Sequence, residues 1–388
     1  MSNRQPVSFL RWLRLSPTKS ALILTFFLAT FWYYSLILPA HPSGYERHAL
    51  QRDLVSRNLW TGDGAILPSS DAVKEVCRQH GYSAYPQNNG TKRRVYDVFP
   101  FMLELDWLEI RLRTLSPFVD YFVIVEFSTT FTGLPWKPIL EANMDRFKEF
   151  KDRMLRFVVD DEVESDWVWD HEIFMKNQML YQTFPSFIGT EREAKEGDVI
   201  MVSDVDEIPK PETVTLLRHC EFPERLTLRS HFYYYSYQWL HRGEQWHHPQ
   251  ATTYHGIEGT ISPQDLRRGE GGTGFSLFHP IQRWMKGGNL WDAAWHCSSC
   301  FKTIKQVQDK MGAFSHIEYN TPENRKPKAI AERFRNGLDL FGRGGQLYDR
   351  VEDNKDVPKY VLNNAERFKY LIDRDGEDAA FVDYYEAI

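Results

Sequence analysis

The sequence predicts an α/β fold built on a mostly parallel sheet and preceded by one N-terminal transmembrane helix. The first indication is the alternation of β-favouring apolar runs with helical periods after residue 95. The second is a single long apolar stretch near the N-terminus. The third is an acidic motif directly after one of the apolar runs, where open α/β sheets bind their ligands.

Size and charge narrow the classes of function. The 388 residues are 42% hydrophobic, which is enough for a sizeable core and argues against global disorder. A net charge of -6, with Lys and Arg scattered along the chain, argues against a nucleic-acid partner.

The long apolar stretch extends from Ala21 to Leu38 and contains no charged residue. As a helix it spans roughly 27 Å, which suits a membrane anchor better than a cleaved signal peptide. Positive charge precedes it at Arg4, Arg11, Arg14 and Lys19. The positive-inside rule therefore predicts a type II orientation, with residues 1–20 cytosolic and the rest lumenal. The length of the span fits the thinner membranes of the early secretory pathway, so the Golgi or ER membrane is expected.

Residues 39–94 are rich in Pro, Gly, Ser, Asn and charge and are predicted as a lumenal stem, so that the folded domain covers residues 95–388. Asn89-Gly90-Thr91 in the stem is an N-glycosylation sequon. The cysteines are expected to form two disulfides, with three pairings open and free thiols as the alternative; they are Cys77, Cys220, Cys297 and Cys300.

Periodicity predicts the elements of the domain. Leucines at 105, 108, 112 and 115 predict a helix over residues 103–115. Apolar runs at 121–127, 155–159 and 199–202 predict buried strands. Further helices are expected at 170–181, 212–219, 303–314 and 326–338, and one long aromatic strand at 226–240.

Asp204-Val205-Asp206-Glu207 places three acids directly after the run at 199–202. Carboxylates near a sheet core must be solvated, paired or metal-bound. A divalent cation can join such carboxylates to a nucleotide diphosphate that they would otherwise repel. The motif therefore predicts a metal-dependent site for a nucleotide-linked substrate, and the alternative is a solvated turn.

Two segments together resemble glycosyltransferase family 17. They are Val199 to Pro209, which contains the acids, and Trp295-His296-Cys297-Ser298-Ser299-Cys300-Phe301. The resemblance covers roughly residues 95 to 345. It implies an inverting transferase with a GT-A-like, Rossmann-type domain, UDP-N-acetylglucosamine as donor, manganese as cofactor and a mannose of an N-linked glycan as acceptor in β-1,4 linkage. The chain departs at Ser203, where the bisecting members of the family have a further aspartate, which leaves the acceptor open.

The resemblance assigns the metal and ribose roles to Asp204 and Asp206, with Asp206 the stronger candidate for direct ligation. Glu207 is expected to orient these acids or to bind the sugar. His296 is expected as a third metal ligand or a diphosphate contact, because neutral imidazole suits manganese, and the alternative is a hydrogen-bonded core histidine.

Four further residues are expected at the donor. Glu126 is a candidate contact for the nucleobase or ribose, and the alternative is a salt bridge at the end of a strand. Lys137 is a candidate contact for the diphosphate, and the alternative is a solvated lysine in a loop. Trp295 and His316 complete this set. An inverting transfer also needs a base for the acceptor hydroxyl, and the candidates are Asp292 and Glu318.

Two alternatives differ in function. One is a membrane-anchored, glycan-binding pseudoenzyme, and the other is a transferase with another nucleotide sugar or acceptor. A metal-dependent phosphoesterase is disfavoured because it needs several dispersed His and Asp ligands.

Overall fold

The computed structural model describes residues 25–26, 70–86, 92–130, 132–161, 163–165, 167–270, 286–313 and 316–384. Contacts divide the chain into two units, Met1–Asp53 and Leu54–Ile388, and nearly all described residues belong to the second. Apart from Thr25 and Phe26, the predicted anchor lies outside the described residues, as does the sequon at Asn89. No helix in the described part of the chain is long and apolar enough to cross a membrane.

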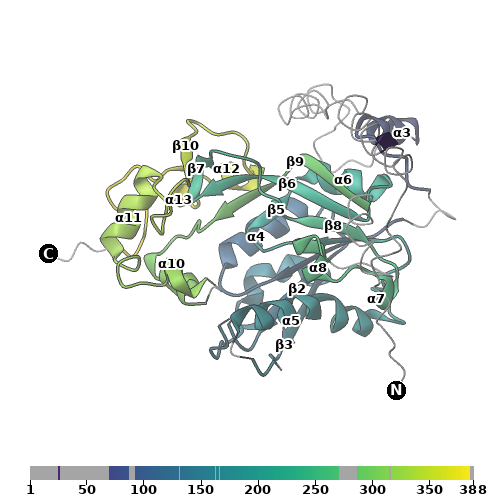
Figure 1. Cartoon of the computed structure of the whole chain (residues 1–388), viewed down its shortest axis with the longest axis horizontal. Helices are drawn as coiled ribbons and strands as arrows, with labels where there is room; N and C mark the ends of the chain where they lie inside the picture. The colour runs from purple at the N-terminus through teal and green to yellow at the C-terminus, as the bar shows by residue number, and fades with distance from the viewer. Residues whose placement is uncertain are drawn as a thin grey trace, which may run out of the picture. The chain divides into compact units, whose positions relative to one another are not determined.

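The unit Leu54–Ile388 is built on a mixed sheet of ten strands (Figure 1). The strands are β1 (Val95–Pro100), β2 (Tyr121–Phe127), β3 (Met154–Val159), β4 (Val199–Val202), β5 (Glu207–Pro209), β6 (Arg225–Tyr234), β7 (Ser236–His241), β8 (Gln250–Thr253), β9 (Gly287–Ser298) and β10 (Tyr348–Arg350). Their order is β10-β7-β6-β8-β4-β1-β2-β3, with β9 paired to β6 and β5 to β9. Strands β3, β2, β1 and β4 are parallel as predicted. Beyond them β6 and β9 are also parallel, but the expectation of a mostly parallel sheet fails because β8, β7, β10 and β5 pair antiparallel.

The helices predicted from periodicity are confirmed within two residues at either end. They are α4 (Leu105–Leu115), α5 (Val168–Tyr181), α6 (Pro211–His219), α10 (Ile304–Ala313) and α11 (Pro327–Asn336). The other helical segments of the described part are α3 (Ser70–Gln79), η3 (Glu141–Phe150), η4 (Phe184–Phe187), α7 (Gly256–Gly259), α8 (Pro263–Arg268), η6 (Ile317–Tyr319), α12 (Lys359–Asn363) and α13 (Lys369–Ile372).

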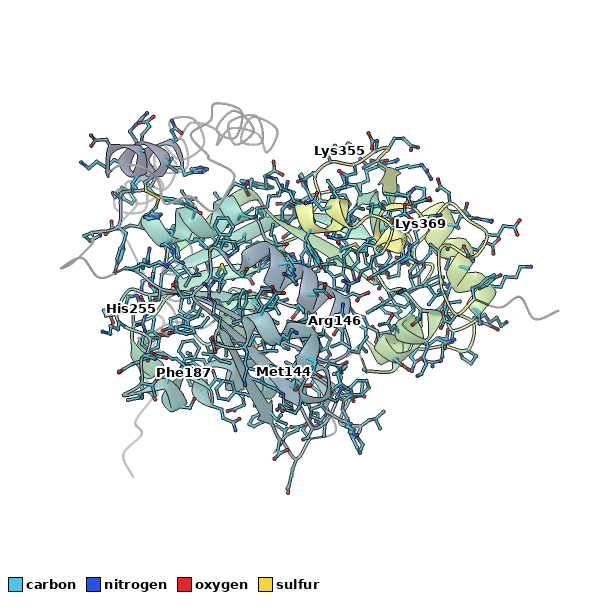
Figure 2. The ribbon with its side chains drawn as sticks, turned by 180° about the vertical axis from the view of Figure 1, so that it is seen from behind. Met144, Arg146, Phe187, His255, Lys355 and Lys369 are labelled. Atoms are coloured by element: carbon cyan, nitrogen blue, oxygen red, sulfur yellow. A yellow bond between two sulfur atoms is a disulfide. The ribbon has the colours of Figure 1, made fainter. Side chains whose placement is uncertain are left out.

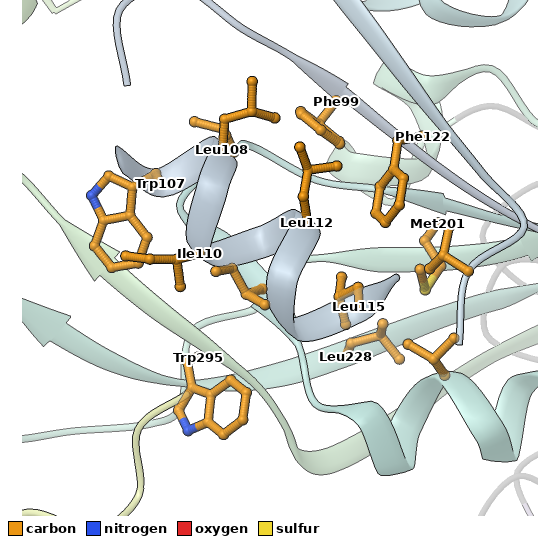
Figure 3. Packing of buried hydrophobic residues seen from close by; sticks show 14 of the residues in the cluster. Phe99, Trp107, Leu108, Ile110, Leu112, Leu115, Phe122, Met201, Leu228 and Trp295 are labelled. Carbon is orange, nitrogen blue, oxygen red and sulfur yellow. The ribbon is translucent and has the colours of Figure 1, made fainter. Parts of the chain in front are cut away.

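Side chains of the parallel strands alternate between two cores. On one face, Phe99, Phe122 and Met201 pack with the leucines of α4, as Figure 3 shows. On the other face, Tyr96 and Val98 pack with α5 and α8. Each such fully buried large apolar side chain contributes about 1.5–3 kcal/mol to stability. Helices on both faces explain why these strands read as unbroken apolar runs.

Helix α4 also joins the sheet to more distant segments. Arg146 of η3, labelled in Figure 2, forms ion pairs with Asp106 and Glu109 of α4. Glu109 additionally accepts hydrogen bonds from Tyr360 and Arg367 near the C-terminus. The polar side of α4 is therefore covered by two segments far from it in sequence.

The predicted long strand at 226–240 is two strands. The chain reverses at Tyr235, whose backbone φ of 69° lies in the left-handed region that disfavours non-glycine residues. Packing of the buried Tyr235 side chain stabilises this turn. Its ring stacks on Phe334 with 3.9 Å between ring centroids, and its hydroxyl donates to the Leu338 carbonyl oxygen. The sequence did not predict this turn, because the aromatic run is continuous and contains no Gly, Asn or Pro at the turn.

Part of the predicted stem is folded. Helix α3 lies within residues 39–94, and a disulfide joins its Cys77 to Cys220 at the end of α6. The second disulfide joins Cys297 to Cys300. The expectation of two disulfides is confirmed, and of the three pairings left open this one is observed. The folded unit therefore begins before residue 95.

Replacing both Cys77 and Cys220 by serine should lower the free energy of unfolding by about 2–4 kcal/mol, because this bridge spans 143 residues of sequence and restricts the unfolded chain. Chemical denaturation measures the loss, and limited proteolysis should cut near α3 first. An unchanged denaturation midpoint would show that α3 is not tied to the domain in this way.

Candidate active site

The acids Asp204, Asp206 and Glu207 follow β4 at the carboxyl edge of the parallel strands. Arg111 of α4, which is fully buried, holds the backbone of this segment. Its guanidinium donates two hydrogen bonds to Asp97, of 2.6 and 2.7 Å. It also donates to the carbonyl oxygens of Asp204, Val205 and Glu207, at 3.0, 3.3 and 2.8 Å. A planar guanidinium can hold several acceptors in one fixed arrangement, so Arg111 orients the whole segment.

Pairing between β5 and β9 brings His296 to the acids. Glu207 lies opposite His296 in this pairing, and the Cys297 N–H donates to the Asp206 carbonyl oxygen at 3.3 Å. The His296 Nε2 atom is 3.9 Å from Asp206 Oδ1. The imidazole stacks on Phe232 with 4.9 Å between ring centroids, which fixes its plane.

Protein cations surround the acids. Arg267 of α8 donates to Asp204 at 2.8 Å and to the two oxygens of Glu207 at 2.8 and 3.2 Å. Lys310 of α10 lies 3.2 Å from Asp206 Oδ2, and Lys176 of α5 lies 4.0 Å from Asp204. The Trp246 Nε1–H donates to Glu207 at 2.9 Å. The Asp204 side chain keeps 38% exposure, so it remains open to a ligand.

These cations set the protonation of the acids. Burial opposes ionisation of Asp204, but Arg267 and Lys176 outweigh it and hold the pKa of this carboxyl below its ordinary value. Burial likewise opposes ionisation of Glu207, and Arg267 brings the pKa of Glu207 well below its ordinary value. Both groups are therefore carboxylates at neutral pH.

The residues present suit a divalent cation completed by a ligand. Asp206 and His296 offer a carboxylate oxygen and an imidazole nitrogen, a donor set that manganese accepts. The ring nitrogen that faces Asp206 is Nε2, and the Nδ1 atom is buried with no hydrogen-bond partner among the described residues. In the described part of the chain, the three ligand-type side chains with donor atoms within 4.8 Å of one another are His231, Asp292 and Asp356. Asp204, Asp206 and His296 do not belong to that group.

The structure does not bring Trp295 to the acids. Successive side chains of β9 point to opposite faces, so the side chains of Trp295 and His296 lie on different faces, and Trp295 belongs to the buried cluster that contains the α4 leucines. It is 8% exposed and donates from Nε1 to Asp356 at 2.8 Å. The structure thus gives Trp295 a packing role and a hydrogen bond to Asp356, and its expected donor contact remains a prediction.

The other expected donor contacts lie on three segments, at the end of β2, in the loop that follows β2 and just before η6. Glu126 is 1% exposed, pairs with Arg156 at 2.6 Å and accepts the backbone N–H groups of Ile139 and Leu140, which matches the salt-bridge alternative. Lys137 is an exposed side chain in the loop after β2. His316 contacts Glu318 at 2.8 Å and lies edge-on to Trp169, with 5.3 Å between ring centroids.

Asp292 belongs to a separate cluster. The His231 ring bridges Asp292 at 2.6 Å and Asp356 at 2.5 Å, and Lys210 lies 2.8 Å from Asp356. Asp292 adopts a φ of 59° where the register of β6 and β9 shifts, so its side chain turns to His231. Its expected role as base is not supported by proximity to the acids, because these contacts hold it in the cluster.

This cluster predicts pH-dependent stability. Burial lowers the pKa of His231, but Asp292 and Asp356 outweigh burial and raise it to about 9. Since the unfolded value is about 6.5, the stabilisation is fully present below about pH 6.5 and is lost as the pH rises through about 9, by up to about 3 kcal/mol. Unfolding at pH 6.5 and 9.5 should show that wild type loses more stability than His231→Gln. Parallel pH profiles of the two proteins would contradict this assignment.

Residue patterns missed the basic residues of the site. Arg111 stands among the leucines that define the apolar face of α4, and a charged residue at such a position was a usable signal. Arg267, Lys176 and Lys310 lie on three different helices, and no local spacing connects them with residues 204–207. Only the tertiary arrangement brings them to the acids.

The sequence profile of glycosyltransferase family 17 matches residues 67–261 and 285–377. The chain is 26% identical over 310 residues to the Homo sapiens protein named beta-1,4-mannosyl-glycoprotein 4-beta-N-acetylglucosaminyltransferase, and 25% identical to its Rattus norvegicus counterpart. Each alignment covers 72% of this chain and 55% of the relative. The chain thus spans about half the length of the curated relatives it matches.

Two solved structures show a weaker likeness. Mannosyltransferase PcManGT from Pyrobaculum calidifontis, in complex with GDP-Man and Mn2+, matches with a TM-score of 0.33 at 10% identity, over 76% of this chain and 75% of that chain. The inositol-1-phosphate CTP transferase from T. maritima matches with a TM-score of 0.26 at 10% identity, over 72% of this chain and 98% of that chain. Scores this low support no inference about fold or ligands.

The family profile covers well over half of the chain, including the acids and His296. The predicted class of enzyme, a glycosyltransferase, is confirmed at the level of the family. The chain belongs to glycosyltransferase family 17.

Proposed function

We propose that this chain transfers N-acetylglucosamine from UDP-N-acetylglucosamine to a mannose of an N-linked glycan, forming a β-1,4 linkage with inversion. The observation that carries the proposal is the meeting of Asp206 and His296 beside Asp204 at the carboxyl edge of the sheet, within a family 17 domain. The names of the relatives support the choice of sugar and acceptor. A GT-A-like arrangement of the domain is part of the proposal.

Asp206 and His296 would hold manganese. When bound, such an ion neutralises the diphosphate and stabilises it as a leaving group. Asp204, whose carboxylate is partly exposed, would bind a ribose hydroxyl or the ion, while Arg267 pairs with both Asp204 and Glu207. Glu126, Lys137 and His316 remain predictions as donor contacts, and Asp292 and Glu318 remain predictions as the base.

We further propose a type II protein of the Golgi or ER membrane, with the anchor at 21–38 and the catalytic domain in the lumen. The two disulfides support this placement because disulfides persist in oxidising compartments. Asn89 in the stem would then be accessible to N-glycosylation.

Incubation of the purified full chain with a panel of nucleotide sugars and glycan acceptors, with and without manganese, tests the function. We expect mass spectrometry to detect one added N-acetylhexosamine on a mannose-containing N-glycan, only with UDP-N-acetylglucosamine and a divalent ion. Glycan binding without turnover of any donor would favour a pseudoenzyme. Transfer from a different nucleotide sugar would correct the donor and keep the class.

A further inference from the structure

Lys310 is a cation aimed at the carboxylate that is the strongest candidate for direct metal ligation. Its Nζ atom lies 3.2 Å from Asp206 Oδ2, and its side chain is 28% exposed. The ammonium also lies 5.3 Å from the centre of the Phe301 ring, which limits its positions. The side chain of Asp206 itself is 8% exposed, so little of the carboxylate is open to solvent.

An ammonium and a divalent ion on the same carboxylate repel each other, and the repulsion is strong because the group is poorly hydrated. The ion must therefore displace Lys310 or bind weakly. A diphosphate removes the conflict, because its oxygens can accept from the ammonium and coordinate the ion at once. Metal affinity and nucleotide affinity should then be coupled through this side chain.

We propose that Lys310 makes metal binding depend on the nucleotide: its ammonium occupies Asp206 in the free protein and donates to the diphosphate once donor and metal are bound. This inference rests on the proposed function, because it takes a nucleotide diphosphate as the ligand. Lys310 would thus weaken binding of the metal ion alone and favour binding of the ion together with its nucleotide.

Calorimetric titration of the full chain tests the coupling. Mn2+ is titrated alone and with saturating UDP, and UDP is titrated with saturating Mn2+, for wild type, Lys310→Met and Lys305→Met. Lys305 is the matched control because it lies on the same helix, pairs with Asp309 and is 75% exposed. Near-UV circular dichroism confirms folding, and Lys310→Gln replaces Lys310→Met if that variant does not fold.

We expect the Lys310→Met protein to bind Mn2+ alone at least about tenfold more tightly than wild type and to bind UDP at least about tenfold more weakly. Lys305→Met should match wild type in both. Unchanged or weaker binding of Mn2+ by a folded Lys310 variant overturns the inference while the proposed function stands. Equal affinity of wild type for Mn2+ with and without UDP also overturns it. Failure of wild type to bind UDP at all overturns the proposed function instead.

Discussion

Replacement of Asp206 by asparagine is expected to reduce sugar transfer by about 100-fold or more while the domain stays folded. Asparagine keeps the size and hydrogen bonding of the side chain but removes the charge that would hold a metal ion and its diphosphate. The carbonyl oxygen that accepts from Cys297 belongs to the backbone and is not altered. Donor turnover at saturating manganese and thermal unfolding are the two measurements.

Asp204→Asn should reduce transfer similarly, because its carboxylate lies in the same acidic segment and remains partly open. Asp152→Asn serves as the control, since this exposed acid precedes β3 at the opposite edge of the sheet. It should change neither turnover nor stability beyond about 0.5 kcal/mol. Wild-type turnover in Asp206→Asn would remove Asp206 from the metal site.

Replacement of Arg111 by methionine should lower the free energy of unfolding by about 3–5 kcal/mol. The Arg111 and Asp97 side chains are fully buried, so the change leaves an uncompensated carboxylate in the core. It also removes the donor that holds the carbonyl oxygens of residues 204, 205 and 207. Denaturation with guanidinium chloride measures the stability, and manganese binding should weaken in the fraction that remains folded.

Arg113→Met is the matched control because it lies on the same helix. Its ion pair with Glu149 is exposed, at 37% and 45% for the two side chains, and such pairs contribute less than about 1 kcal/mol. Equal losses of stability in the two variants would show that Arg111 does not organise the acidic segment.

Local patterns predicted the elements better than their pairing. The apolar runs of β2 and β4 and the leucine spacing of α4 identified these elements, because the buried residues of each element form a pattern within its own sequence. The antiparallel strands beyond β4 were not recognised, since the turn at Tyr235 depends on its packing against Phe334. Helix α3 was missed because a disulfide to Cys220 ties a polar segment to the domain.

In the candidate site, too, the residues of a local motif were predicted and those brought together only by tertiary packing were not. Asp204, Asp206 and Glu207 are contiguous, so their motif identified them, and β5–β9 pairing then placed His296 beside them. The adjacent Trp295 packs in the buried cluster that contains the α4 leucines, and its role as a donor contact remains a prediction. The cations around the acids come from α4, α5, α8 and α10, and only tertiary packing relates them to the motif.

The most direct test of the account is release of UDP from UDP-N-acetylglucosamine by the purified full chain, in the presence of an N-glycan acceptor and with either manganese or a chelator. The account predicts acceptor-dependent release with manganese, loss of release with the chelator and recovery when the ion is restored. Wild-type turnover of this donor that is unaffected by the chelator would contradict the claim that Asp206 and His296 hold a metal-bound nucleotide sugar.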